Sequence, residues 1–553
     1  MSRERKVFIT IALALMAVLF FTACGGGTDQ PPAQNQGGQP QQSQQGQQGQ
    51  PNQPPQQGSP PPASSDGPQY GGILRVATAA DTSMALGFPW EHQVFPSQFL
   101  LSGYVEPLLI AKSDGTFDYS LATAFEGDPE NLEIRFTLRE GVKFSDGSDF
   151  NAEAVAWNVQ MQIDTREMNP AVIGVEATGE YTVTVYLNQY LNSIFPIFSN
   201  RPFSMISKAN YETNGADFAR QNPVGTGPFV LDRQIPAVSV TYSKNPNYWR
   251  EGMPYLDGLE FISMTDVMTQ NAAMISTGSD GIDQLTTGNY EQVSMLRDQA
   301  PVYITMLPSG YSAMIPNSGI EGSPMADVRV RQAVAYAIDR EALTAARGFG
   351  IGRPATQILA EGFIGHLEDK SLNLSYDPAR SRELLAEAGF PDGFTTQFHH
   401  LGGDRDVATA LQGMLSEIGI TAQMNFPEAG AASELRGGVF EGFLFTQITN
   451  LTNSGSTIRL NMDPDYQYFP SMWRPAEEMR QDFNSLRAAV GLDAEELHAS
   501  RINRLFLENM VLIPVLDTQS CWIMKNNVHD TGFGFHTPQT VWLPYQTWKS
   551  DPL

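Results

Sequence analysis

The sequence predicts an α/β protein with at least two lobes. The chain has 553 residues, which is too long for one ordinary hydrophobic core. Strand patterns and helix patterns are mixed over the whole length after about residue 70, which favours an α/β architecture over a sandwich or a helical bundle. No internal repeat occurs at a fixed period, so the sequence does not indicate a solenoid.

Two segments have the pattern of β-strands. Residues 73–78 read Ile-Leu-Arg-Val-Ala-Thr and follow the Gly71-Gly72 pair, so we expect the first strand there. Residues 182–187 alternate between the two faces of a strand and are rich in β-branched side chains, which predicts a further strand.

Helix signals follow along the chain. We expect helices after the N-cap residues Asn151, Asp327 and Asp377, and a fourth over residues 407–418. Each segment carries apolar residues at helical spacing. Asp377 is followed by Pro378, which suits the first helical position, and Gly389 is expected to end that helix.

The charge balance excludes several classes of protein. Lys and Arg number 34 against 60 Asp and Glu, which gives a net charge of −26. Such a chain repels phosphate backbones, so we expect no nucleic-acid partner. Two cysteines are too few for a disulfide scaffold. Cys521 is expected to be a buried structural thiol.

The amino terminus resembles that of bacterial lipoproteins. Three basic residues precede an apolar run over residues 7–21, and Phe-Thr-Ala-Cys then ends at Cys24. The resemblance implies cleavage after residue 23 and lipidation of Cys24, although Phe21 stands where Leu is usual. The alternative is a signal anchor with an incidental cysteine. Residues 24–70 are dominated by Gln, Pro and Gly and are expected to form a disordered linker.

No catalytic motif is apparent in the sequence. It lacks His-Glu-x-x-His, Gly-x-Ser-x-Gly and any Gly-Lys pair, which argues against the common zinc hydrolases, serine hydrolases and phosphate-loop ATPases. Gly348 to Gly352 is rich in glycine but has the wrong spacing for a dinucleotide site. His399 and His400 point to opposite faces if they lie on a strand, so we expect no metal site there. Since the catalytic and dinucleotide motifs are also missing, we expect no cofactor and no enzymatic activity.

Several segments in order resemble the family 5 extracellular solute-binding proteins. These are Glu-Pro-Leu-Leu at 106–109, Phe-Thr-Leu-Arg-Glu-Gly-Val-Lys-Phe-Ser-Asp-Gly at 136–147, Asn-Pro-Val-Gly-Thr-Gly-Pro-Phe at 222–229, Asn-Pro-Asn-Tyr-Trp at 245–249, Asp-Val-Arg-Val-Arg-Gln-Ala at 327–333, Ala-Ile-Asp-Arg at 337–340 and Tyr-Asp-Pro at 376–378. Read as residues alone, they supply turns, close backbone approaches and helix caps, so they indicate a scaffold more than a ligand.

The resemblance implies a two-lobed α/β fold of the periplasmic-binding-protein type II. Lobe I would span residues 71–308, with an extra subdomain inserted at about 100–205. Lobe II would span residues 309–527, and residues 528–553 would return to lobe I.

The function implied is capture of a peptide or another small polar solute and its delivery to the permease of an ABC importer. The protein would be a monomer outside the cytoplasm, held by its lipid on the periplasmic face or outer surface of the membrane. Two alternatives remain open, namely a hydrolase tethered to the envelope and a ligand-sensing receptor subunit of the same fold.

The ligand site departs from the peptide-binding pattern. Oligopeptide-binding members carry an Asp in lobe II that pairs with the peptide's amino group, and residues 440–450 match that region without an Asp. We therefore expect a neutral pocket, unless the register is slipped and Asp463 or Asp465 takes the role. The candidate ligand-binding residues are Trp90, Tyr311, His400, Gln447, Asn450 and Trp473.

Overall fold

The computed structural model describes residues 67–92, 95–112, 115–372, 375–451, 454–463, 477–532 and 542–550. The expected signal peptide, Cys24 and the linker up to residue 66 lie outside these ranges, as do Asp465 and Trp473. The described residues fall within one compact unit, residues 53–553. Among them, no helix has both the length and the hydropathy that a membrane span requires.

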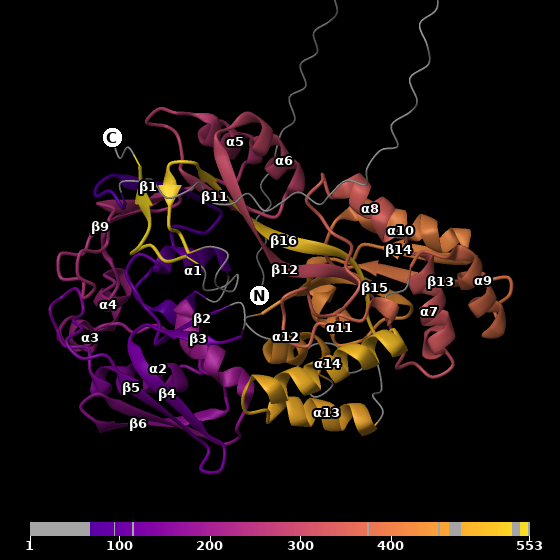
Figure 1. The fold of residues 1–553 in the computed structure, drawn as a ribbon, viewed down its shortest axis with the longest axis horizontal. Helices are drawn as coiled ribbons and strands as arrows, with labels where there is room; N and C mark the ends of the chain where they lie inside the picture. The colour runs from indigo at the N-terminus through magenta and orange to yellow at the C-terminus, as the bar shows by residue number, and fades with distance from the viewer. Residues whose placement is uncertain are drawn as a thin grey trace, which may run out of the picture. The chain divides into compact units, whose positions relative to one another are not determined.

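A ten-stranded mixed sheet forms the centre of the fold (Figure 1). Its strands, in spatial order, are β14 (Ile420–Asn425), β13 (Phe394–His400), β15 (Phe443–Thr449), β12 (Val302–Pro316), β16 (Ile513–Lys525), β11 (Gln284–Thr287), β1 (Ile73–Thr78), β10 (Gly258–Ser263), β9 (Ser239–Lys244) and β8 (Phe229–Ile235). We call β11, β1, β10, β9 and β8 half I of the sheet, and β14, β13 and β15 half II. The strand expected at residues 73–78 is confirmed as β1.

Two long antiparallel strands, β12 and β16, join the halves. Residues 302–308 of β12 pair with β16 where β16 lies beside β11. Residues 310–314 of β12 pair with both β16 and β15, and residues 315–316 pair with β15. The register shifts between Pro308 and Gly310. A β-carbon on Gly310 would lie 1.8 Å from the main-chain oxygen of Ile448, so only glycine fits at this shift.

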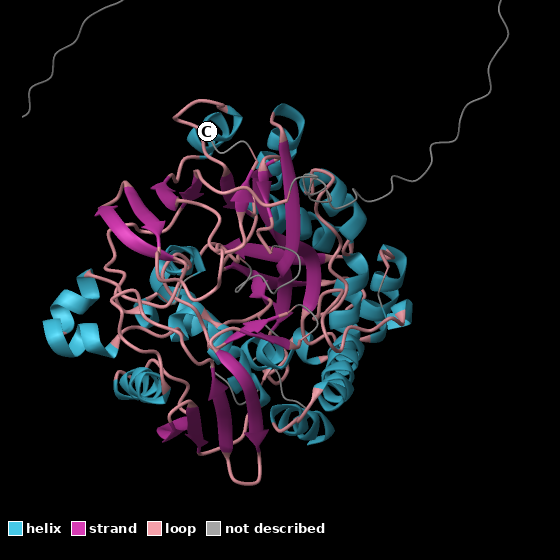
Figure 2. Cartoon of the chain, turned by 60° about the vertical axis from the view of Figure 1, so that its left-hand side comes forward, coloured by secondary structure: helices cyan, strands magenta, loops and turns pink. Residues whose placement is uncertain are grey.

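A separate four-stranded antiparallel sheet consists of β4 (Ala122–Asp128), β5 (Glu133–Leu138), β7 (Thr182–Leu187) and β6 (Val172–Gly179). Figures 1 and 2 show it below the large sheet, with α2 (Ala152–Asp164) packed against it. Its core is a cluster of buried residues between Leu108 and Met205 that includes Phe136. Val334 lies in a different cluster, so these two residues do not share one core.

Short hairpins, thirteen further α-helices and short 3-10 helices make up the other regular elements of the described residues. The hairpins pair β2 (Leu109–Ala111) with β3 (Phe117–Tyr119), and β17 (Val528–His529) with β18 (Trp548–Lys549). The helices are α1 (Phe95–Leu101), α3 (Lys208–Asn214), α4 (Ala216–Gln221), α5 (Val267–Ile275), α6 (Tyr290–Gln299), α7 (Val328–Ala337), α8 (Arg340–Arg347), α9 (Pro378–Glu387), α10 (Arg405–Glu417), α11 (Ala432–Arg436), α12 (Ser454–Met462), α13 (Glu477–Arg487) and α14 (Leu492–Asn509).

The helix caps expected from the sequence are confirmed. The side chains of Asn151, Asp327 and Asp377 each accept a hydrogen bond from a main-chain N–H in the first turn of α2, α7 and α9. The helix expected over residues 407–418 begins two residues earlier, at Arg405, because Asp404 caps it. The cap satisfies a main-chain donor that the helix leaves unpaired at its start.

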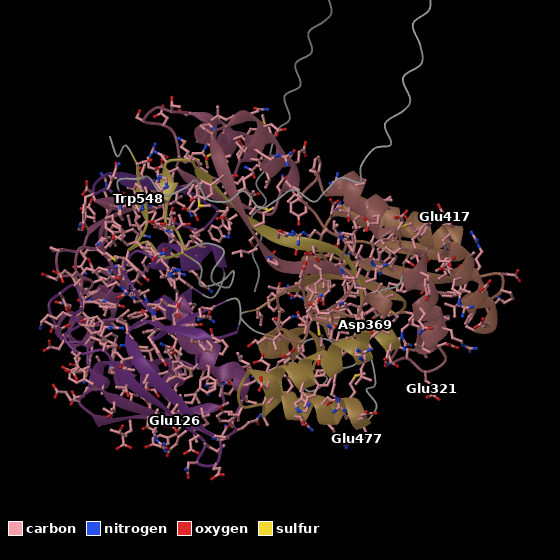
Figure 3. All side chains as sticks on the ribbon, viewed as in Figure 1. Glu126, Glu321, Asp369, Glu417, Glu477 and Trp548 are labelled. Carbon is pink, nitrogen blue, oxygen red and sulfur yellow. The ribbon has the colours of Figure 1, made fainter. Side chains whose placement is uncertain are left out.

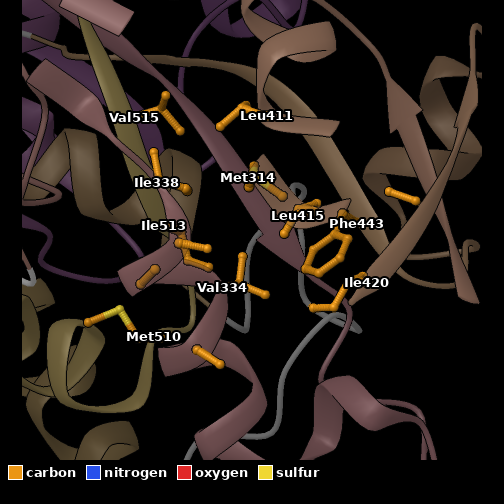
Figure 4. Packing of buried hydrophobic residues seen from close by; sticks show 14 of the residues in the cluster. Met314, Val334, Ile338, Leu411, Leu415, Ile420, Phe443, Met510, Ile513 and Val515 are labelled. Carbon is orange, nitrogen blue, oxygen red and sulfur yellow. The ribbon is translucent and has the colours of Figure 1, made fainter. Parts of the chain in front are cut away.

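Half II of the sheet is covered by an apolar core (Figure 4). Val334 and Ile338 from α7 and its C-cap, and Leu411 and Leu415 from α10, lie in one cluster with Phe443 of β15. All five side chains are buried. The apolar stripe that the sequence shows after Asp327 therefore faces this core, where burial of each large side chain contributes about 1.5–3 kcal/mol.

Two of the sequence motifs form one structural unit. The buried carboxylate of Glu106 accepts hydrogen bonds of 2.7 Å from Tyr248 Oη and from Trp249 Nε1. Burial raises the pKa of Glu106. A β-carbon on Gly225 would lie 2.1 Å from the main-chain oxygen of Tyr104, which confirms the close backbone approach expected of that segment. These motifs hold the scaffold together.

Cys521 is buried, as the sequence predicts, and several of the acids that make the chain negative are exposed. Cys521 is fully buried in β16, and burial raises its pKa to about 12, so it behaves as a core residue. Figure 3 labels the exposed acids Glu126, Glu321, Glu417 and Glu477 on widely separated parts of the surface.

Candidate functional site

A cavity of about 700 Å³ lies where β12 and β16 pass between the two halves of the sheet. Half I contributes the residues after β11 and the start of α6, at 288–291. Half II contributes the end of α8 with Phe349, the start of α10, and residues 447–450 at the end of β15. The joining strands contribute Ser309 and Ser312 from β12 and residues 516–520 from β16. The cavity is therefore built from segments of both halves.

The most notable polar group of the cavity is Asn450. Its side chain is 2% exposed, and neither Oδ1 nor Nδ2 has a hydrogen-bond partner among the described residues. Asn450 is fixed in place by its own main-chain N–H, which donates to the oxygen of Ser309 at 2.9 Å. A buried amide without partners is unfavourable, so a bound molecule that supplies both an acceptor and a donor would be stabilised here.

The charged residues of the cavity are concentrated around Arg347. The guanidinium of Arg347 donates to one oxygen of Asp404, with distances of 2.9 Å from Nε and 2.7 Å from Nη2. It also lies 3.2 Å from Asp406. The hydrogen bond to Asp404 and the nearby charges of Asp404, Asp406 and Glu291 raise the pKa of Arg347. Glu291 belongs to half I and Arg347 to half II, so this attraction acts between the halves.

A further acid, Asp517, lies in β16 among the residues that line the cavity. Burial raises the pKa of Asp517 to about 7, and the nearby Arg353 offsets part of that rise. Its main-chain oxygen accepts a hydrogen bond of 3.0 Å from Tyr290 Oη. At neutral pH the carboxyl group is therefore close to half protonated, and a cationic group on a ligand would favour its ionised form.

The structure brings together only some of the residues that the sequence singled out. Gln447 and Asn450 line the cavity. Trp90 is 3% exposed in a hydrophobic core of half I and stacks on Phe88, and Tyr311 is 1% exposed in a core of half II. His400 is half-buried between Phe426 and Phe445. These three are not among the residues that line the cavity.

The expectation of a neutral pocket does not hold for this cavity. Among the described residues, its lining includes the acids Glu291, Asp404 and Asp517 and one cation, Arg347. Of these four charged residues, only Asp404 stands in a local sequence pattern that indicates its position, because it can cap the helix that follows it. Asp463, considered as a replacement acid, is 2% exposed and accepts a hydrogen bond of 2.7 Å from Arg487 Nε, so its carboxylate is already paired with a cation.

The lining of the cavity has groups that can hold a polar molecule. Among the described residues of the cavity there is no histidine, cysteine or lysine. Ser312 Oγ donates to the main-chain oxygen of Leu516 at 3.3 Å. What the cavity offers is a set of hydrogen-bond donors and acceptors, charged groups of both signs, and apolar surface from Phe349 and Val407.

Comparison with known proteins identifies the family. The profile of the bacterial extracellular solute-binding proteins, family 5 (middle part), matches residues 116–463. The chain is 30% identical over 372 residues to the glutathione-binding protein GsiB of Salmonella typhi, a match that covers 66% of this chain and 71% of that protein.

Solved structures agree with the fold. HbpA2 from Haemophilus parasuis superposes with a TM-score of 0.75 at 18% identity, covering 86% of this chain and 99% of that one. The periplasmic binding protein DppA from Helicobacter pylori, in complex with the peptide STSA, superposes with a TM-score of 0.67 at 20% identity, covering 87% and 98%. With a family profile that matches well over half of its length, the chain belongs to the bacterial extracellular solute-binding proteins of family 5.

Proposed function

We propose that this protein captures a peptide-like solute outside the cytoplasm and presents it to the membrane subunits of an ABC importer. The observation that carries the proposal is the cavity between the two halves of the sheet, with the amide of Asn450 buried and unpartnered at its wall. A cavity of about 700 Å³ lies within the usual range for small-molecule sites, about 300–1,000 Å³. It has room for a short peptide.

The ligands in the names of similar proteins support the class of solute. GsiB is a glutathione-binding protein, and the Helicobacter pylori protein was solved with a four-residue peptide. The Oδ1 and Nδ2 atoms of Asn450 have no hydrogen-bond partner among the described residues. A peptide amide group could supply both, because it has one donor and one acceptor. A free amino group on such a ligand would be drawn to the acids Glu291, Asp404 and Asp517.

The proposed mechanism is closure of two lobes on the solute, without covalent chemistry. We assign lobe I to residues 71–308, with an inserted subdomain at about 100–205, lobe II to residues 309–527, and residues 528–553 again to lobe I. The lobes would rotate about β12 and β16, near the register shift at Pro308 and Gly310. Binding shifts the equilibrium only as far as the solute prefers the closed form to the open one.

Calorimetric titration tests this function. We expect glutathione or a tripeptide such as Ala-Phe-Ala to bind, and Asn450→Ala to weaken the binding about tenfold or more, since a truncated buried hydrogen-bonding residue costs about 1–3 kcal/mol. The matched control is Asn214→Ala on α3, whose side chain is exposed and distant in sequence from the cavity residues. Absence of binding by glutathione and by peptides, or an unchanged affinity in Asn450→Ala, would contradict the proposal.

The membrane anchor is a separate part of the proposal. We infer from the sequence that Cys24, which lies outside the described residues, carries the lipid. Two acyl chains on one anchor make membrane attachment stable, because each buried CH₂ contributes about 0.8 kcal/mol. The test is metabolic labelling with palmitate. Cys24→Ala should lose the label and release the protein from the membrane fraction, while persistent labelling would show that the lipid is elsewhere.

A further inference from the structure

The loop that follows α8 is a tight turn, Gly348 to Gly352, which we call the glycine loop. The N–H of Gly352 donates to the oxygen of Gly348 at 2.9 Å, and a β-carbon on Gly348 would lie 2.4 Å from the oxygen of Thr344. Gly350 has a positive φ of 73°. The glycines therefore serve a turn that other residues would not permit.

The far end of the glycine loop is anchored against half I. Ile351 is 4% exposed and lies in one apolar cluster with Tyr290 of α6. A β-carbon on Gly352 would lie 3.1 Å from Cε2 of Tyr290, so the ring packs directly on the loop backbone. The glycine loop follows α8 of half II, but it packs against Tyr290 of half I.

Phe349 is the residue that the loop leaves exposed. Its φ is 47°, in the left-handed region, and its side chain is 37% exposed while lining the cavity. No aromatic ring or cation packs on it among the described residues. A left-handed conformation crowds the β-carbon of any residue except glycine, and more than a third of the Phe349 surface is exposed instead of being buried to offset that strain.

We propose that Phe349 is a ligand-binding residue that covers an apolar or aromatic side chain of the bound solute. The inference rests on the proposed function and names the class of peptide that the site prefers. The cavity wall also has the apolar residues Val407, Ile448 and Leu516, whereas most of its other lining residues are polar or glycine. An aromatic ring at this place would stack on a ligand ring or pack on an aliphatic side chain, and would exclude water from it.

The test compares two peptides and three variants by calorimetric titration. Wild-type protein is expected to bind Ala-Phe-Ala more tightly than Ala-Gly-Ala. Phe349→Gly should weaken Ala-Phe-Ala by about tenfold, and Ala-Gly-Ala much less, because the peptide ring loses its covering surface. Its melting temperature should equal or exceed that of wild type, because glycine relieves the strain. Phe349→Tyr should retain the preference.

Phe218→Ala is the matched control, since Phe218 on α4 is 48% exposed and does not line the cavity. It should leave both affinities unchanged. If wild type binds both peptides equally and Phe349→Gly alters neither affinity, the role of Phe349 is wrong while the proposed function stands. If wild type binds neither peptide nor glutathione, the proposed function fails and this inference fails with it.

Discussion

Tyr290 and Asp517 connect the two halves at the edge of the cavity. The hydroxyl of Tyr290, at the start of α6, donates to the main-chain oxygen of Asp517 in β16 at 3.0 Å. The ring is 9% exposed and packs on Gly352 at the end of the glycine loop. One side chain of half I therefore contacts both a joining strand and a loop that leads into half II.

Removing this hydrogen bond should destabilise the protein slightly. Tyr290→Phe keeps the packing of the ring and leaves the Asp517 oxygen without its donor, so we expect a loss of about 1 kcal/mol. Urea unfolding followed by tryptophan fluorescence measures it. Tyr376→Phe is the control, because Tyr376 is 43% exposed and should show no change. Equal effects in the two variants would show that the Tyr290 hydrogen bond adds nothing.

Asp517 should make the stability depend on pH. Its pKa is about 7 in the folded protein and about 3.9 in an unfolded chain, so between these values the folded state holds a proton that the unfolded state has lost. The stability from this group is therefore fully present below pH 4 and is lost as the pH rises through 7.

The variant Asp517→Asn removes that dependence. We expect it to be more stable than wild type at pH 8 by about 2 kcal/mol, and by much less at pH 5. The value is about half of the free energy that corresponds to the whole pKa difference, because Asp517 is half-buried and solvent screens its charge. Thermal unfolding of the ligand-free protein at both pH values measures it. Asp392→Asn, at an exposed position, is the control. A difference that grows toward low pH would reverse the assigned sign.

Arg340 should be essential to the packing of half II. Its buried guanidinium donates to the main-chain oxygens of Pro514 at 2.9 Å and Ala355 at 3.1 Å, and burial lowers its pKa to about 10. Arg340→Met leaves these oxygens unpaired and should cost about 3 kcal/mol. Arg504→Met, an exposed position on α14, should cost under about 0.5 kcal/mol. Comparable urea midpoints for the two variants would rule out this role.

The charges of the cavity should select among peptides. In the part of the chain that the structure describes, three acids and one arginine line it, and the arginine is already bonded to Asp404. We expect Ala-Lys-Ala to bind about fivefold more tightly than Ala-Glu-Ala at low ionic strength, with a smaller ratio in high salt because ions screen the charges. Titrations of both peptides at two salt concentrations measure it. Tighter binding of Ala-Glu-Ala at either salt concentration would contradict it.

Local features of the fold were predictable from the sequence. The strands at residues 73–78 and 182–187 and the caps Asn151, Asp327 and Asp377 were found where expected. Both features depend on neighbouring residues alone. A cap requires a side chain within three residues of the N–H from which it accepts, and a strand is indicated by the alternation of side chains within its own segment. The apolar spacing predicts the start of α10 two residues too late, because the helix begins directly after its cap, Asp404.

The site was only partly predictable. The family pattern at residues 440–450 predicts Gln447 and Asn450 as ligand-binding residues, and both line the cavity. For Trp90 the sequence supplies only the residue type, which does not distinguish a cavity wall from a core, and Trp90 lies in a core. The free energy of burying a large ring favours the core wherever the fold provides one.

What the sequence by itself determined about this protein is its scaffold, through helix caps, strand alternation and the family motifs. What only the tertiary structure decided is the composition of the cavity. Glu291, Arg347, Asp404 and Asp517 are separated by dozens of residues along the chain, and they line one cavity because β12 and β16 pair over most of their length and join the two halves. Such pairing depends on contacts across the whole sheet, so no local pattern in the sequence records which charges it brings together.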